Sequence, residues 1–96
     1  MSIFSFFSKK KPLDEDTRRE ILLRKGRITE GIILDNSLNA QGEIIEVFFT
    51  YSVGGSDYES SQFLNDEQKK TPIKYAPGAR IAVRYDPKMP SNSIVV

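Results

Sequence analysis

From Arg27 onward, hydrophobic and polar residues alternate with the period of two that is typical of β-strands. The clearest run is EIIEVFFTYSV, in which one face carries Ile45, Val47, Phe49, Tyr51 and Val53. The earlier run RITEGIILD predicts a strand with Ile28, Ile32 and Leu34 on its inner face and Ile33 on the other. Three later strands are predicted at about 56–64, in RIAVRYD with Ile81, Val83 and Tyr85 inward, and in the terminal SIVV.

Glycine and proline mark the boundaries between these strands. Gly54-Gly55 predicts a two-residue hairpin turn, which places Tyr58 opposite Tyr51. Gly31, inside its strand, predicts a bulge or a sharp bend. DNSLNAQG reads as a polar loop, and NDEQKKTP as a stretch with a short helical turn. Pro77-Gly78 fits a type II turn, and Asp86-Pro87 in RYDPKMPSN predicts the reversal before the last strand.

The segment 14–26 has the pattern of a helix. Acidic residues crowd its start and Arg24 and Lys25 its end, which suits the helix dipole, and Gly26 can terminate it. Its apolar patch is small and consists of Ile21, Leu22 and Leu23. Such a helix needs a surface to pack on.

These elements define one domain, because 96 residues suffice for one and not for two. Five short strands with tight turns predict a mainly β fold over residues 27–96. We expect a small bent sheet or a partly open five-stranded barrel of the OB or SH3-like kind, preceded by one N-terminal α-helix.

The first 13 residues form a separate apolar and polybasic segment, MSIFSFFSKKKPL. The charge follows the apolar run, unlike in a secretory signal, and the run is too short to span a bilayer. One interpretation is contact with a membrane interface, made by Ile3, Phe4, Phe6, Phe7, Lys9, Lys10 and Lys11. The alternative is a frayed terminus or one folded back on the domain. The first interpretation gives a cytoplasmic protein held peripherally at the inner face of a membrane.

Charge is divided into blocks along the chain, although the net charge is only +1. Residues 32–67 contain seven Asp and Glu and no Lys or Arg, whereas residues 68–96 contain six Lys and Arg and one Asp. Such blocks can mark separate binding faces. We favour the simpler interpretation that acidic and basic strands lie side by side and pair.

The residue types in this chain give little support for a catalytic site. The chain contains no Cys and no His, so disulfides, thiolate metal sites and the usual general base are excluded. We found neither a Ser-x-x-Lys motif nor a glycine-rich loop with phosphate-binding spacing. We therefore expect no catalytic residue, cofactor or metal site, and a protein that is not an enzyme.

The C-terminal two thirds resemble a known family. The segments EGIIL, VFFTYSVGGSDYESS and YAPGARIAVRYDPKMPSNSIVV are similar to domain-of-unknown-function family 3592, over roughly residues 27–96. The matching positions are Gly31, Tyr51, Val53, Gly55, Tyr58, Tyr75, Gly78, Val83, Tyr85, Asp86, Pro87 and Pro90. Ala76 departs from the proline usual there. Transmembrane helices often flank members of that family, and the Phe-Lys start here is a candidate reduced substitute. The resemblance implies no activity.

A second apolar set is predicted on the sheet face away from the core. It contains Ile33, Ile44, Phe48 and Phe63, and we expect the helix residues Ile21–Leu23 to cover it. If a partner covers it instead, the candidate interaction surface is Ile33, Ile44, Phe48, Arg80 and Arg84. The prediction is thus a non-enzymatic binding or scaffolding module with an unknown protein partner. Alternatives are a single-stranded nucleic-acid binder and a homo-oligomer paired through strand edges.

Overall fold

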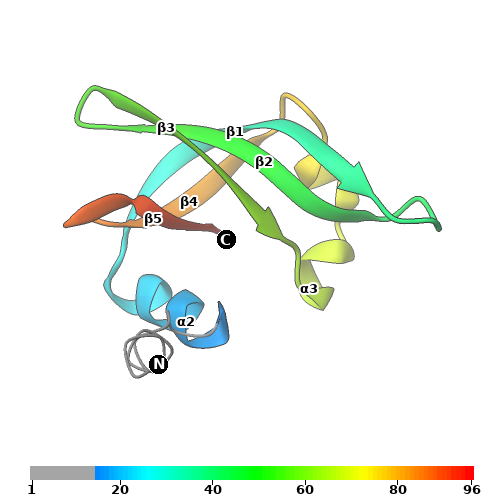
Figure 1. Ribbon diagram of the computed structural model, residues 1–96, viewed down its shortest axis with the longest axis horizontal. Coiled ribbons are helices and arrows are strands. Elements are labelled where there is room, and N and C mark those ends of the chain that lie inside the picture. The colour runs from blue at the N-terminus through cyan, green and yellow to red at the C-terminus, as the bar shows by residue number, and fades with distance from the viewer. Residues whose placement is uncertain (1–14) are drawn as a thin grey trace, which may run out of the picture.

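The computed structural model describes residues 15–96 (Figure 1). Its helical elements are α2 (Glu15–Lys25), α3 (Asp66–Lys69) and the short 3-10 helix η1 (Pro72–Tyr75). The strands are β1 (Arg27–Leu38), β2 (Ile44–Val53), β3 (Ser56–Phe63), β4 (Arg80–Asp86) and β5 (Met89–Val95). The helix and the strands predicted from the pattern are therefore present.

All five strands form one antiparallel sheet in the order β3-β2-β1-β4-β5. The long strand β1 lies at its centre and pairs with β2 on one side and β4 on the other. The sheet curls so far that its two edges approach each other (Figure 1). The backbone N–H of Val95 on β5 donates to Oε1 of Gln62 on β3 at 2.8 Å. The predicted mainly β, barrel-like fold with one N-terminal helix is confirmed.

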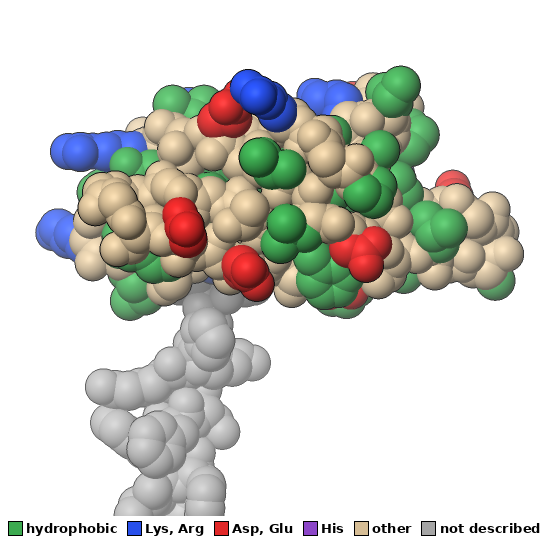
Figure 2. All heavy atoms as spheres, turned by 90° about the horizontal axis from the view of Figure 1, so that it is seen from above, with side chains coloured by type: hydrophobic (Ala, Val, Ile, Leu, Met, Phe, Trp, Pro, Cys, Tyr) green, Lys and Arg blue, Asp and Glu red, His purple; other side chains and the backbone are tan. Residues whose placement is uncertain are grey.

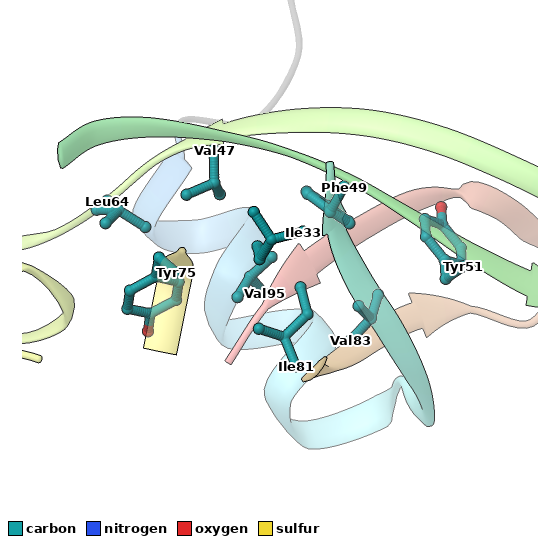
Figure 3. Packing of buried hydrophobic residues seen from close by; sticks show 9 residues of the cluster. All are labelled: Ile33, Val47, Phe49, Tyr51, Leu64, Tyr75, Ile81, Val83 and Val95. Carbon is teal, nitrogen blue, oxygen red and sulfur yellow. The ribbon is translucent and has the colours of Figure 1, made fainter. Parts of the chain in front are cut away.

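The core fills the inside of this curved sheet. Figure 3 shows its side chains converging from β1, β2, β4 and β5 and from the segments around α3 and η1. The stick-drawn members are Ile33, Val47, Phe49, Tyr51, Leu64, Tyr75, Ile81, Val83 and Val95. The Tyr51 ring stacks on Phe49 at 5.9 Å and on Tyr58 at 5.5 Å between ring centroids. The inward faces predicted from Val47 to Val53 on β2 and for β4 are therefore confirmed, whereas at the start of β2 Ile44, and not the predicted Ile45, packs against the core.

The face prediction for β1 was wrong. Ile33, expected on the outer face, is 1% exposed, whereas Ile28, Ile32 and Leu34 are 60%, 42% and 47% exposed. The cause is the register with β2, which places Ile33 opposite the buried Phe49 and so turns Ile33 inward. Because three consecutive residues, Ile32 to Leu34, are all apolar, counting hydrophobic side chains selected the wrong face.

Gly31 marks a close approach between strands and no bulge. It pairs in register with Tyr51 on β2 and Ile81 on β4. A Cβ atom there would lie 2.8 Å from both the Thr50 carbonyl oxygen and Val83 Cγ2. A first irregularity falls three residues later, between Ile33 and Asp35, and leaves Leu34 as the extra residue, and a second lies between Ser37 and Leu38.

The turns follow the sequence prediction closely. Gly54 and Gly55 have φ of 58° and 87°, and Tyr58 lies opposite Tyr51. Gly78 has φ of 89°, and Ala79 N donates to Ala76 O at 2.9 Å across the Pro77-Gly78 turn. The polar loop is shorter than expected, because β1 continues through Leu38.

The Asp86-Pro87 corner is a turn whose carboxylate accepts a hydrogen bond from the backbone N–H of Lys88 at 2.8 Å. Asp86 pairs with Met89 directly across the turn. The next pair is Tyr85 with Ser93, so the ladder is interrupted around Pro90. The predicted corner is therefore confirmed, although β5 already begins at Met89.

Helix α2 does not cover the outer face of the central strands, contrary to the sequence prediction. It contacts β4 and β5, and Leu22 is its buried residue. A single residue, Gly26, connects α2 to β1, so the helix stays beside the start of β1 and the end of β4. Gly26 N donates to Leu22 O at 2.8 Å, and Gly26 O accepts from Arg84 at 3.1 Å. With this short connection α2 packs against β4 and β5 and not on the predicted face.

Candidate interaction surface

The outer face of β1 carries a row of exposed aliphatic side chains. We call Ile28, Ile32 and Leu34 the outer strip. It runs along the central strand, so it has a strand on either side and does not lie at an edge. At 42–60% exposure none of the three is part of the core. Antiparallel sheets commonly expose one face to water, but that face is then usually polar.

Residues of the neighbouring strands extend this surface. Ile32 lies in register between Thr50 on β2 and Arg80 on β4, and Ile28 lies opposite Arg84. Phe48 on β2 is half-buried, and Phe63 at the end of β3 is 69% exposed. Figure 2 shows hydrophobic and acidic side chains together over this face, with Lys and Arg side chains at its margins. The face is therefore a mixed apolar and acidic surface.

The charge blocks are not neutralised by pairing across the sheet. Within residues 15–96 one ion pair joins two strands, Arg80 to Glu30 at 3.6 Å. The other two, Arg18–Glu15 and Lys70–Glu67, are local. The reason is the strand order: acidic β2 and β3 are neighbours, and β1 separates them from basic β4. Our interpretation that acidic and basic strands pair side by side was therefore wrong.

The five residues predicted as an interaction surface do not form one continuous surface in the structure. Ile33 is a core residue, and Ile44 is half-buried against the core, so neither belongs to an interaction surface. Phe48 does lie on the outer face, opposite Asp35 and Ser61. Arg80 is exposed beside the outer strip, and Arg84 is half-buried and bonded to Gly26 O. The candidate membrane contacts in residues 3–11 lie outside the described residues.

Sequence reasoning missed the outer strip, because it assigned those three residues to the core. One signal in the sequence could have placed them. From Val47 to Val53 the odd-numbered positions of β2 are all apolar and define its inner face, and pairing Gly31 with Tyr51 then fixes the register of β1. That register turns Ile33 inward and the outer strip outward.

A well-formed hollow lies between α2 and the β4–β5 turn. It has a volume of about 320 Å³ and is lined by Arg18, Ile21, Leu22, Lys25, Gly26, Asp86, Pro87, Lys88 and Asn92. Arg18 is held by Glu15 at 2.7 Å and by Asn92 at 2.8 Å. Lys25 and Lys88 are exposed at its mouth. It combines an apolar floor with cationic walls.

The perturbed titratable groups belong to the core. Burial raises the pKa of the Tyr51 phenol, which donates to Pro90 O at 2.6 Å. Burial also raises the pKa of Tyr75, and the charge of Arg19 opposes the rise. Both tyrosines are therefore neutral packing residues at ordinary pH. In residues 15–96 no group of three or more acidic side chains is placed to hold a metal ion.

None of the described helices is long and apolar enough to cross a bilayer. The fold and the surface together define a small, nearly closed five-stranded β-barrel-like domain with an N-terminal helix. A family model for a domain of unknown function, DUF3592, matches residues 26–96. The chain belongs to this family, as its hairpin and Tyr-Asp-Pro corner predicted. No curated protein and no solved structure showed significant similarity to the chain.

Proposed function

We propose that this protein is a non-enzymatic binding or scaffolding module that holds a protein partner on the outer face of β1. The observation that carries the proposal is the outer strip, three aliphatic side chains left uncovered along the central strand while α2 lies elsewhere. Exposed apolar surface of this kind, rimmed by polar residues, marks interaction sites in soluble domains.

The character of the partner follows from the rim of the strip. Glu30 lies between Ile28 and Ile32 on the same face, and Asp35 follows Leu34. Phe48 adds a half-buried aromatic ring beside them. Because Glu30 is already paired with Arg80 at 3.6 Å, the rim has mixed charge, and a partner with an apolar centre and a cation near Asp35 complements this surface.

Capture from native lysate with matched variants tests this proposal. Ile32→Thr with Leu34→Thr keeps the fold, because both side chains are exposed, and we expect it to lose the captured protein. Ile73→Thr is the matched control, since Ile73 is the most exposed large aliphatic residue and lies on η1. Loss of the partner with Ile73→Thr alone, or retention with the double variant, contradicts the proposal.

We also propose that residues 1–11 hold this module peripherally at a membrane, with the domain on the cytoplasmic side. The composition of the segment supports this, since phenylalanines suit the acyl boundary and lysines the anionic headgroups. Liposome co-sedimentation with and without residues 1–11 is the test. Equal sedimentation of the two forms removes this part of the proposal.

Single-stranded nucleic acid is the alternative ligand of such a small barrel. The charge of the sheet counts against it. Strands β2 and β3 carry Glu46, Asp57 and Glu59 and contain no Lys or Arg, so they repel phosphate. Oligonucleotide binding that weakens steeply with salt would nevertheless restore this alternative.

A further inference from the structure

One end of the domain combines cationic and apolar side chains from three elements. The last turn of α2 supplies Leu23, Arg24 and Lys25, the start of β1 supplies Arg27, and the β4–β5 hairpin supplies Lys88 in its turn and Met89 at the start of β5. All six are exposed. We call this set the basic end.

Strand pairing and the groove bring these elements together. Arg27 pairs with Tyr85, and the adjacent Asp86 pairs with Met89 across the turn. Lys25 and Lys88 line opposite walls of the 320 Å³ groove, one on α2 and one on the turn. Residues that are about 60 positions apart in the chain therefore form one surface.

The cations of the basic end have no acidic partner at ion-pair distance within residues 15–96. The one acid that lines the groove beside them, Asp86, accepts a hydrogen bond from Lys88 N within the turn. Exposed Leu23 and Met89 lie among these charges. Unpaired cations mixed with exposed apolar side chains are the composition that binds anionic bilayers.

From this arrangement we infer that the basic end is a second membrane contact, which binds the anionic surface of a lipid bilayer. Lipid phosphates lie against Lys25 and Lys88 at the mouth of the groove, and Met89 and Leu23 enter the headgroup region. The inference builds on the membrane contact proposed for residues 1–11. Vesicle binding by separate variants of the two regions distinguishes a failure of one contact from a failure of the other.

This contact gives the domain a defined orientation. Helix α2 and the start of β1 lie together at one side of the molecule, and β2 and the β2–β3 turn lie across the opposite side (Figure 1). The acidic β2 and β3 are then held away from the anionic surface, which lowers electrostatic repulsion. Much of the outer face stays open to a partner.

The test is vesicle co-sedimentation of the full-length chain with phosphatidylcholine alone and with added phosphatidylglycerol. Lys25→Glu with Lys88→Glu is expected to lower partition onto the anionic vesicles at least about tenfold and to leave the neutral vesicles unchanged. Lys70→Glu with Lys74→Glu makes the same charge change on the far side, at α3 and η1, and is expected to bind within about twofold of the wild type. Thermal unfolding of each variant verifies the fold.

Two further arms separate the explanations. Phe6→Ser with Phe7→Ser weakens the contact proposed for residues 1–11 and leaves the basic end intact. If this variant alone loses binding and the Lys25/Lys88 variant binds like the control, the inference is overturned while the N-terminal contact stands. If the Lys25/Lys88 variant alone loses binding, the inference stands and the N-terminal contact fails. Tighter binding of a single-stranded oligonucleotide than of anionic vesicles, lost in the same Lys25/Lys88 variant, also overturns the bilayer as the ligand.

Discussion

Two adjacent isoleucines on β1 provide the sharpest test of the structure. Ile33 is 1% exposed inside the core, and Ile32 is 42% exposed on the outer face. Replacing either by Thr keeps the β-branched shape and the strand propensity, so the difference between the two variants measures burial alone. The hydrophobic pattern of the sequence predicts the opposite order of effects from the structure.

The magnitudes follow from these exposures. At Ile33, Thr loses buried carbon worth about 1.5 kcal/mol and adds a buried hydroxyl that costs about 1–3 kcal/mol without a partner. We expect the free energy of unfolding to fall by about 2.5–4.5 kcal/mol. At Ile32 the hydroxyl remains in water, and we expect a loss below about 1 kcal/mol.

Urea and thermal unfolding followed by circular dichroism measure both values. For a domain of this size, each kcal/mol lowers the midpoint temperature by about 4–8 °C, so the two variants are easily resolved. Ile33→Val serves as a graded control with an expected cost of about 0.5–1.5 kcal/mol. A larger loss for Ile32→Thr than for Ile33→Thr would refute the register of β1 and, with it, the outer strip.

Three further outcomes are expected. Gly31→Ala should lower the free energy of unfolding by about 1–3 kcal/mol in urea titration, because the new Cβ would lie 2.8 Å from the Thr50 carbonyl oxygen; an unchanged midpoint contradicts that contact. Gln68→Ala should cost about 1–3 kcal/mol, since its side chain donates to Val95 O at 3.0 Å and accepts from Asn65 N at 3.0 Å, whereas Lys69→Ala should be nearly neutral. Because burial raises the pKa of Tyr51 above its ordinary 10.0, the unfolded chain loses that proton first. Stability should therefore be complete below pH 10 and fall as the pH rises further, and Tyr51→Phe should flatten this fall.

The sequence predicted a strand or turn correctly where its hydrophobic pattern was compatible with a single inward face. In the strand ending at Val53 the odd-numbered positions from Val47 onward are all apolar, and Gly54-Gly55 permits the positive φ that the turn needs. Register and turn then followed together, down to Tyr58 opposite Tyr51. The family assignment was equally accessible, because the Asp86-Pro87 corner has a distinctive sequence.

The same reasoning failed where a pattern had two solutions. Ile32, Ile33 and Leu34 are apolar without interruption, so β1 could turn either face inward, and only pairing with Phe49 decides between them. The wrong face for β1 also made the predicted interaction surface wrong, since Ile33 was assigned to the surface and the outer strip to the core. Helix placement failed for a related reason: its small apolar patch suits several surfaces, and the one-residue connection at Gly26 selects among them.

Closure of the barrel depends on side-chain hydrogen bonds that cannot be predicted from local sequence patterns. The backbone carbonyl of Val95 accepts hydrogen bonds from Arg19 on α2 at 3.1 Å and from Gln68 on α3 at 3.0 Å, while Val95 N is bonded to Gln62 on β3. Polar side chains thereby satisfy the outward backbone groups of Val95, the last residue of β5, which opposes pairing with another chain at that end of the strand. Because these side chains come from three elements far apart in the sequence, only the assembled fold brings them to one residue. The closed edge also limits where a partner can bind, and this favours the outer face of β1 over strand addition at β5.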